Sequence, residues 1–208
     1  YATEVSRHTS AFFRPNFWVN TPDILPFHLQ SGNPAIFALR VVLASTLSPS
    51  WGMYAGYELY EHRRFKEGGE EYMDSEKYEI KVRDWEGAAK MQVTLAPFIT
   101  KLNEIRKKHI ALARLRNLVF HTSDNDSIIA YSKREGNDLI LVTVNLDPLN
   151  AQETTVHWDL AALGIKDSRF KVTDLIDGAQ YEWDPHSFVR LDPSRPVGKV
   201  AHIMAVNL

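Results

Sequence analysis

Hydrophobic and polar positions fall into two unlike patterns along the 208-residue chain. In the first half, bulky apolar runs are separated by polar stretches. Residues 12–20 are rich in strand-favouring aromatic side chains, which predicts a short buried strand. Residues 33–47 are apolar nearly all round, which predicts a largely buried helix. Asn33 can cap this helix, and Pro34 suits its first turn, where a missing N–H is tolerated.

A second strand and a second helix are expected in the same half. Residues 51–60 predict a short strand that gives way to a loop at Gly56. Residues 90–115 carry apolar side chains at helical spacing, with Pro97 at a start or a kink. Between them, residues 61–85 are polar and charged without a clean period. A connection of this length inside a compact region is usually functional or disordered.

From about residue 118 the pattern changes to short alternating strands separated by Asp, Asn, Gly and Pro. Such a series predicts an antiparallel β-sandwich. We therefore divide the chain into residues 1–116, a piece of an α/β architecture, and residues 117–208, the β-sandwich. Two strands cannot bury both faces of a parallel sheet, so we expect the first part to need strands that precede it in a longer polypeptide. The second part could fold alone.

Composition excludes several kinds of protein. The chain is 44% hydrophobic and 24% charged with a net charge of −2, so no basic footprint for nucleic acid or an anionic membrane is expected. Cysteine is absent, which removes disulfides, thiolate metal sites and cysteine nucleophiles. No apolar run approaches the roughly 18 residues of a membrane span, and no signal peptide begins the chain. We expect a cytoplasmic protein.

Histidine and glycine spacing gives no sign of a metal or a phosphate loop. The eight histidines form no ligand pattern, and the one Gly-Gly pair stands alone in a charged stretch. We therefore expect no metal and no other cofactor. His109 falls at the apolar spacing of the second helix and is interpreted as a packed core histidine.

Asp23 is the first candidate for chemistry. It follows the first predicted strand in the stretch NFWVNTPD. In α/β barrels the carboxyl ends of the strands carry the reactive residues, because the adjoining loops converge there. An Asp after Pro is equally at home in a plain turn, where its carboxylate accepts backbone N–H groups. These residues alone leave both interpretations open.

The two strand ends, joined by one helix, resemble the last two β/α units of the catalytic barrel in the α-amylase superfamily. There the seventh strand ends in a Phe-Val-x-Asn-x-Asp motif and the eighth in a Tyr-x-Gly-x-Glu motif. Here they read WVNTPD (18–23) and YAGYE (54–58), with Thr-Pro where the superfamily usually has His. Together with EEYMDSEKYEIKVRDW and LNEIRKKHIALARLRNLVFH, the chain looks like the bacterial α-1,4-glucan:maltose-1-phosphate maltosyltransferases.

The resemblance implies a fold and an activity. Residues 1–116 would be strand seven to helix eight of a TIM (β/α)8 barrel, followed by the C-terminal β-sandwich of residues 117–208. The whole protein would move maltosyl units from α-maltose 1-phosphate to the non-reducing end of an α-1,4-glucan. It would act by retaining double displacement and release phosphate. Neither a nucleotide nor a metal is implied.

The resemblance also implies partners within a longer polypeptide. The nucleophile and the acid/base would lie upstream of Tyr1, on strands four and five, so this chain alone is expected to be inactive. The remainder of the polypeptide, including the upstream barrel strands, would be its first partner, and the full-length protein would be a homodimer. Asp84 follows Asp23 in the chain and cannot be the upstream nucleophile, so it is interpreted as structural.

The resemblance gives roles to four residues. Asp23 would be the third carboxylate, which orients the donor sugar and stabilises the transition state. Asn20 would help to shape the site and would bind the substrate. Lys77 and Tyr78 would reach the donor disaccharide, because an ammonium donates to several hydroxyls and a phenol both packs on a ring and bonds. A solvated loop of alternating charges is the other interpretation of residues 74–80.

Two rival functions stay open. One is a different amylase-superfamily hydrolase or transglycosylase, against which the Thr-Pro pair and the Ser-Glu-Lys-Tyr segment argue. The other is a non-catalytic module whose β-sandwich binds glucan.

Overall fold

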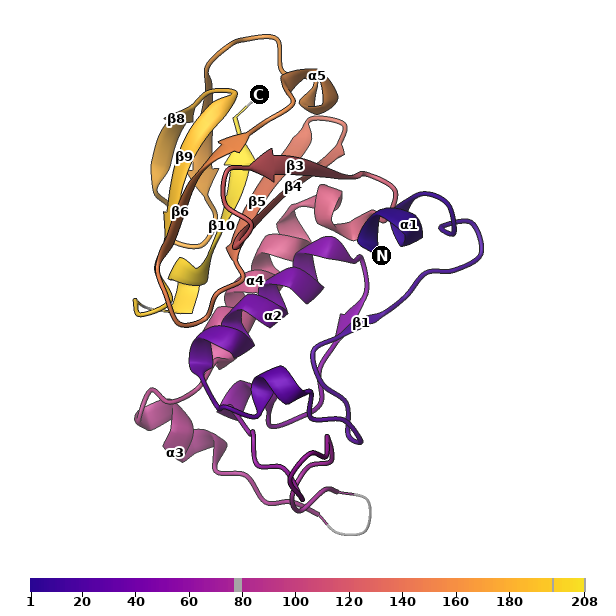
Figure 1. The fold of residues 1–208 in the computed structure, drawn as a ribbon, viewed down its shortest axis with the longest axis vertical. Coiled ribbons are helices and arrows are strands. Elements are labelled where there is room, and N and C mark those ends of the chain that lie inside the picture. The colour runs from indigo at the N-terminus through magenta and orange to yellow at the C-terminus, as the bar shows by residue number, and fades with distance from the viewer. Residues whose placement is uncertain (77–79, 196, 208) are drawn as a thin grey trace.

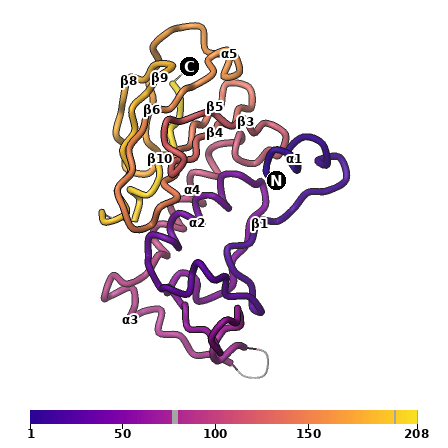
Figure 2. The backbone as a smooth tube through the Cα atoms, viewed as in Figure 1, coloured from indigo at the N-terminus to yellow at the C-terminus, as the bar shows by residue number. Residues whose placement is uncertain are grey.

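The computed structural model describes residues 1–76, 80–195 and 197–207. Figure 1 shows a helical part and an antiparallel β part stacked along the long axis of the molecule. The tube in Figure 2 passes from the helical part into the β part after α4, and the N-terminal helix α1 lies beside β3. Within these residues, no helix combines the length and the apolar character needed to cross a membrane.

The helical part contains one pair of very short strands and several helices. In chain order these are α1 (Ala2–Ser6), β1 (Phe17–Trp18), η1 (Phe27–Leu29), α2 (Pro34–Leu47), β2 (Trp51–Gly52), η2 (Tyr57–Leu59), α3 (Trp85–Lys90), α4 (Ala96–Lys108) and η3 (Ile110–Ala113). β1 and β2 pair in parallel, with Phe17 opposite Trp51.

Both predicted strands are shorter than expected. The N–H groups of Phe12 and Phe13 donate back to the carbonyl of Thr9, so this segment is a turn, and Phe12 is 82% exposed. The strand predicted over residues 51–60 ends early because the chain turns at Gly56, whose φ is +96°. The predicted loop at Gly56 is confirmed, whereas the predicted lengths of the strands were wrong.

The predicted helix over residues 33–47 is confirmed. Asn33 caps α2 by accepting a hydrogen bond from the N–H of Ala35 across 2.9 Å, and Pro34 occupies the first turn. At the other end, Arg106 of α4 donates to the carbonyls of Ser48 and Pro49, at 3.2 and 2.8 Å. A cation at this position satisfies carbonyls that have no partner within the helix.

The single helix predicted over residues 90–115 is wrong, because the chain forms α3, α4 and η3 instead. Asp84 caps α3 by accepting from the N–H of Gly87 across 2.8 Å, which confirms its structural interpretation. Pro97 lies in the first turn of α4 and marks a start rather than a kink.

His109 ends α4 and is not packed among apolar side chains as expected. It is partly buried, and its Nδ1 lies 2.8 Å from Oδ1 of Asp138 on β5. The other carboxylate oxygen of Asp138 accepts from the N–H of Ala111. The pair therefore fastens the end of α4 and the start of η3 to the sheet.

The predicted antiparallel β architecture is confirmed. The strands follow the order β8-β7-β10-β5-β4-β3-β6-β9 in one eight-stranded sheet. Their bounds are β3 (Leu118–Ser123), β4 (Ile128–Glu135), β5 (Asp138–Asn145), β6 (Gln152–His157), β7 (Phe170–Asp174), β8 (Gln180–Trp183), β9 (His186–Leu191) and β10 (Ala201–Val206). The short helices α5 (Leu160–Leu163) and η4 (Val197–Val200) lie between strands.

The sheet curls until its two ends face each other, as a β-sandwich requires. Val156 and Val189, near one end of the strand order, share a core with Val172 and Met204 near the other. The two indoles of Trp158 and Trp183 stack across this interior at 5.7 Å. The outer face packs against α2 and α4 in a second core. The division of the chain at residues 116 and 117 stays a prediction.

Candidate functional site

The ends of β1 and β2 meet through the side chain of Asn20. Its Oδ1 accepts from the N–H of Tyr54, just past β2, across 2.8 Å. Its Nδ2 donates to the hydroxyl of Tyr72 across 2.7 Å. Asn20 is buried, so these bonds are sheltered from water. The amide therefore joins both strand ends to the charged loop, by which we mean residues 61–76 and 80–83.

Asp23 lies in a turn three residues beyond Asn20, and it is exposed. Thr21 and Ile24 close this turn through reciprocal backbone hydrogen bonds of 3.1 and 3.2 Å. Just after the turn, Glu70 of the charged loop accepts from the N–H groups of Leu25 and Phe27. The turn that carries Asp23 is thus fixed to both the strand end and the charged loop.

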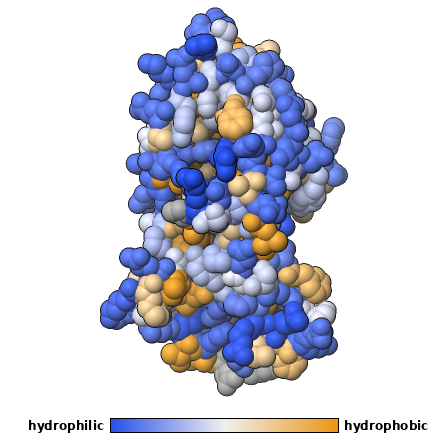
Figure 3. All heavy atoms as spheres, turned by 60° about the vertical axis from the view of Figure 1, so that its left-hand side comes forward, coloured by the Kyte–Doolittle hydropathy of each residue, from blue (hydrophilic) through white to orange (hydrophobic). Residues whose placement is uncertain are grey.

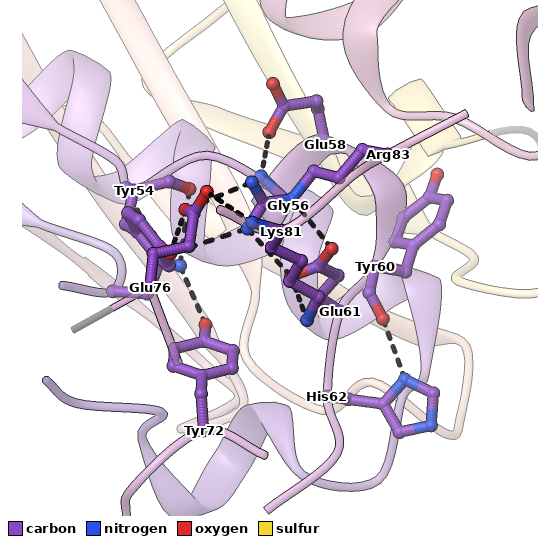
Figure 4. Close-up of polar contacts among 11 residues, drawn as sticks. Tyr54, Gly56, Glu58, Tyr60, Glu61, His62, Tyr72, Glu76, Lys81 and Arg83 are labelled. Carbon is purple, nitrogen blue, oxygen red and sulfur yellow. Dashed lines mark hydrogen bonds and ion pairs between the residues drawn. The ribbon is translucent and has the colours of Figure 1, made fainter. Parts of the chain in front are cut away.

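The charged loop is ordered around one arginine, in what we call the Arg83 cluster (Figure 4). The guanidinium of Arg83 donates to Glu61 at 2.8 Å and to Glu76 at 3.1 Å, and lies over the ring of Tyr54. Lys81 donates to Glu61 at 3.1 Å, and the hydroxyl of Tyr54 donates to Glu76. The cluster consists of Tyr54, Glu61, Glu76, Lys81 and Arg83.

Hydrogen bonds within the cluster favour the ionised form of Glu76. Hydrogen bonds from Tyr54 and then Arg83 hold the pKa of the Glu76 carboxyl below its usual range. Burial lowers the pKa of the Arg83 guanidinium. Its hydrogen bonds to Glu61, Tyr54 and Glu76 outweigh this effect, so the pKa lies above its usual value. Two carboxylates face two cations, so the cluster holds Glu76 in place without a net charge.

Gly56 makes room for this arrangement. A Cβ at this position would lie 2.3 Å from Oε2 of Glu61, and the φ of +96° disfavours any other residue. The N–H of Gly56 donates to the carboxylate of Glu58 across 3.0 Å. In the motif YAGYE the missing side chain of the glycine therefore leaves space for Glu61, and the carboxylate of Glu58 stabilises the turn.

The predicted site residues are only partly covered by the structure. Asn20 and Asp23 lie just past the end of β1. The Arg83 cluster holds Glu76, which is the second residue of the Ser-Glu-Lys-Tyr segment. Lys77 and Tyr78 lie outside the described residues, so their roles stay predictions. The role of Asp23 in the reaction also stays a prediction. Sequence reasoning gave no role to Glu61 or Arg83. Their only signal was opposite charge within a stretch that has no period.

Metal binding has no candidate in the part of the chain that is described. There, no three or more His, Asp or Glu side chains gather in a group that could hold an ion. The described side chains of the site are carboxylates, an amide, phenols and cations.

Solved structures define the class of fold. The chain superposes on an Anoxybacillus α-amylase with a TM-score of 0.66 at 20% identity, covering 98% of this chain and 41% of the other. The α-amylase of Geobacillus thermoleovorans complexed with acarbose gives 0.67 at 13% identity, covering 99% and 42%. The fold is that of part of an α-amylase-type protein.

Proteins related in sequence define the family more narrowly than the solved structures do. The family model described as "GLGE, C-terminal" matches residues 120–206. The chain is 50% identical over 204 residues to α-1,4-glucan:maltose-1-phosphate maltosyltransferase 2 of Streptomyces coelicolor, covering 98% of this chain and 30% of that protein. It is 51% identical over 198 residues to the maltosyltransferase of Mycolicibacterium smegmatis, covering 94% and 28%. The chain belongs to this family and spans about 30% of the length of these relatives.

Proposed function

We propose that the chain is part of a retaining maltosyltransferase. The whole protein transfers maltosyl units from α-maltose 1-phosphate to the non-reducing end of an α-1,4-glucan and releases phosphate. The observation that carries the proposal is the 50% identity to a maltosyltransferase over 98% of this chain. Dimerisation of the whole protein and a cytoplasmic location stay predictions.

The helical part supplies the last two β/α units of a (β/α)8 barrel in this proposal. The parallel pairing of β1 and β2 and their connection through α2 support it. On their outer surface Trp18 is 55% exposed, and it borders a hollow of about 400 Å³ that apolar and polar side chains line together. Nε2 of His28, in the same hollow, is buried without a partner among the described residues. Preceding barrel strands would cover this surface.

Asp23 acts on the donor sugar in the proposed reaction. A carboxylate on another strand attacks the anomeric carbon while phosphate leaves, and the transition state gains oxocarbenium character. Asp23 accepts hydrogen bonds from hydroxyl groups of the donor sugar and stabilises the developing positive charge. Its exposed place in a turn that is tied on both sides suits this task.

Asn20 acts on the site indirectly. Both polar atoms of its amide are already engaged, by Tyr54 and by Tyr72. We therefore assign it as a positioning residue that aligns the two strand ends rather than as a substrate ligand. Lys77 and Tyr78 bind the donor disaccharide in this proposal, and the Arg83 cluster anchors the segment that leads to them.

The experiment is the variant Asp23→Ala in the full-length protein. Phosphate release from α-maltose 1-phosphate, with glycogen as acceptor, should fall by about 10²-fold or more, as it does when other preorganised transition-state contacts are removed. Asp84→Ala is the control, because Asp84 caps α3 and should affect stability but not turnover. A rate near wild type for Asp23→Ala would overturn the assignment.

A further inference from the structure

The two edge strands of the sheet, β8 and β9, border a cleft on the β part. A hollow of about 320 Å³ lies at this place, and a neighbouring one of about 310 Å³ shares its three aromatic residues. We propose that this β8/β9 cleft binds a stretch of α-1,4-glucan, at a site separate from the donor site. The residues that line the cleft include Tyr181, Trp183, Phe188, Arg190, Arg195 and Lys199.

Aromatic rings enter the cleft from both edges. Tyr181 on β8 is 41% exposed, and Phe188 on β9 is 63% exposed. Figure 3 shows this side of the molecule, where single hydrophobic side chains stand among hydrophilic ones over the β part. Between Tyr181 and Phe188, the buried Trp183 stacks on Trp158 and makes a rigid floor of the cleft. Rigid aromatic faces pack against the apolar C–H faces of sugar rings at little entropic cost.

The cations of the cleft are paired with acids. Arg190 lies 3.6 Å from Glu153, and Arg195 lies 3.4 Å from Asp192. Lys199 forms an ion pair with Asp177. A phosphate or a nucleic acid would be drawn by cations in excess, which this arrangement does not offer.

Paired charges suit a neutral ligand with many hydroxyl groups. Each hydroxyl of a glucan can donate to a carboxylate and accept from a guanidinium at the same time. Beneath the exposed rings, Nδ1 of His202 lies 2.6 Å from Oδ2 of Asp174, so the floor keeps its own polar groups satisfied. The aromatic faces then bind the apolar side of the sugar while the rim binds its hydroxyls.

A peptide strand added to the free edge of β8 or β9 is the competing occupant. It is disfavoured because β8 has only four residues, and because the exposed side chains of β9, the other edge strand, include Arg190. Short, charged edges are poor templates for strand addition.

The choice of α-1,4-glucan rests on the proposed function, which makes this polymer the acceptor. A second contact would keep acceptor chains near the protein and raise their effective concentration. Removing it should therefore weaken the use of long glucans and spare short acceptors.

The test is a titration of the full-length protein with maltoheptaose, followed by two-dimensional NMR. Backbone signals of β8 and β9 should shift, and the double variant Tyr181→Ala/Phe188→Ala should bind about tenfold more weakly or worse. The control is Phe12→Ala, an exposed aromatic side chain outside the cleft. The single variant Phe188→Ser gives the same test should the double variant unfold.

Three results would overturn the inference: no shift on titration, shifts confined to other strands, or full affinity in the cleft variants. Failure here is distinct from failure of the proposed function. Asp23→Ala should leave the shifts of β8 and β9 intact. If the wild-type protein releases phosphate normally but shows no binding at the cleft, only the cleft is removed. If the wild-type protein binds glucan at the cleft but releases no phosphate, only the transferase is removed.

Discussion

The Nδ2 atom of Asn20 donates to the hydroxyl of Tyr72 across 2.7 Å, although the two residues are 52 positions apart in the chain. This bond, with the one from the N–H of Tyr54, makes a buried amide the junction between β1, β2 and the charged loop. Burial raises the pKa of Tyr72 to about 12, so its hydroxyl stays protonated at neutral pH. The junction is therefore a neutral hydrogen-bonded one.

We expect Asn20→Ala to lower the free energy of unfolding by about 2–4 kcal/mol, because the partners of the amide lose their bonds inside the protein. Urea denaturation measures the change. Tyr72→Phe removes only one bond and should cost about 1 kcal/mol. The double variant should cost less than the sum of the single ones, since both break the same contact. Full additivity would contradict the coupling.

Arg83→Gln should loosen the charged loop without unfolding the protein. Arg83 binds Glu61 and Glu76 together, and glutamine can bridge only one of them weakly. We expect amide hydrogen exchange in residues 61–76 to become about tenfold faster, while exchange in β4 and β5 stays unchanged. Lys66→Gln, at an exposed position of the same loop, is the control. Equal exchange in both variants would show that Arg83 does not order the loop.

Whether a feature could be predicted from the sequence depends on how far apart in the chain its interacting residues lie. α2 was predicted because Asn33 and Pro34 act on the helix that they begin. The exposed turn at Phe12 was mistaken for a strand, since side-chain type alone does not reveal exposure. The Arg83 cluster joins residues 7 and 22 positions apart, in a stretch where no period marks them. Such contacts are decided by the tertiary fold.

Gly56→Ala should be more damaging than the same change at another left-handed glycine. Gly136 also has a positive φ, of +61°, but a Cβ there would meet nothing within 4 Å. Gly136→Ala should therefore cost only the backbone strain, about 1 kcal/mol. At Gly56 the added Cβ also collides with the carboxylate of Glu61, so we expect about 2–3 kcal/mol. Thermal or urea unfolding of both variants gives the comparison, and equal losses would refute the steric role of Glu61.

Lys133 on β4 is fully buried and should make stability depend on pH. Burial, and then the nearby charge of Arg106, lower the pKa of its ammonium to about 7 from 10.5. Between these two values the unfolded chain binds more protons than the folded one. The free energy of unfolding should therefore rise as pH increases from 7 to 10.5, and this contribution is flat below pH 7.

Lys133→Met should abolish that rise and stabilise the protein at pH 7. Methionine keeps the length of the side chain and removes the cost of burying an ammonium. Within the described residues, the polar contact given up is a long one, 3.5 Å from Nζ to the carbonyl of Leu112. We expect a gain of roughly 1–3 kcal/mol, measured by urea unfolding at pH steps from 6 to 10. The exposed Lys171→Met is the control and should change neither the stability nor its pH dependence. A less stable Lys133→Met variant at pH 7 would show that the buried ammonium is held by contacts stronger than this carbonyl.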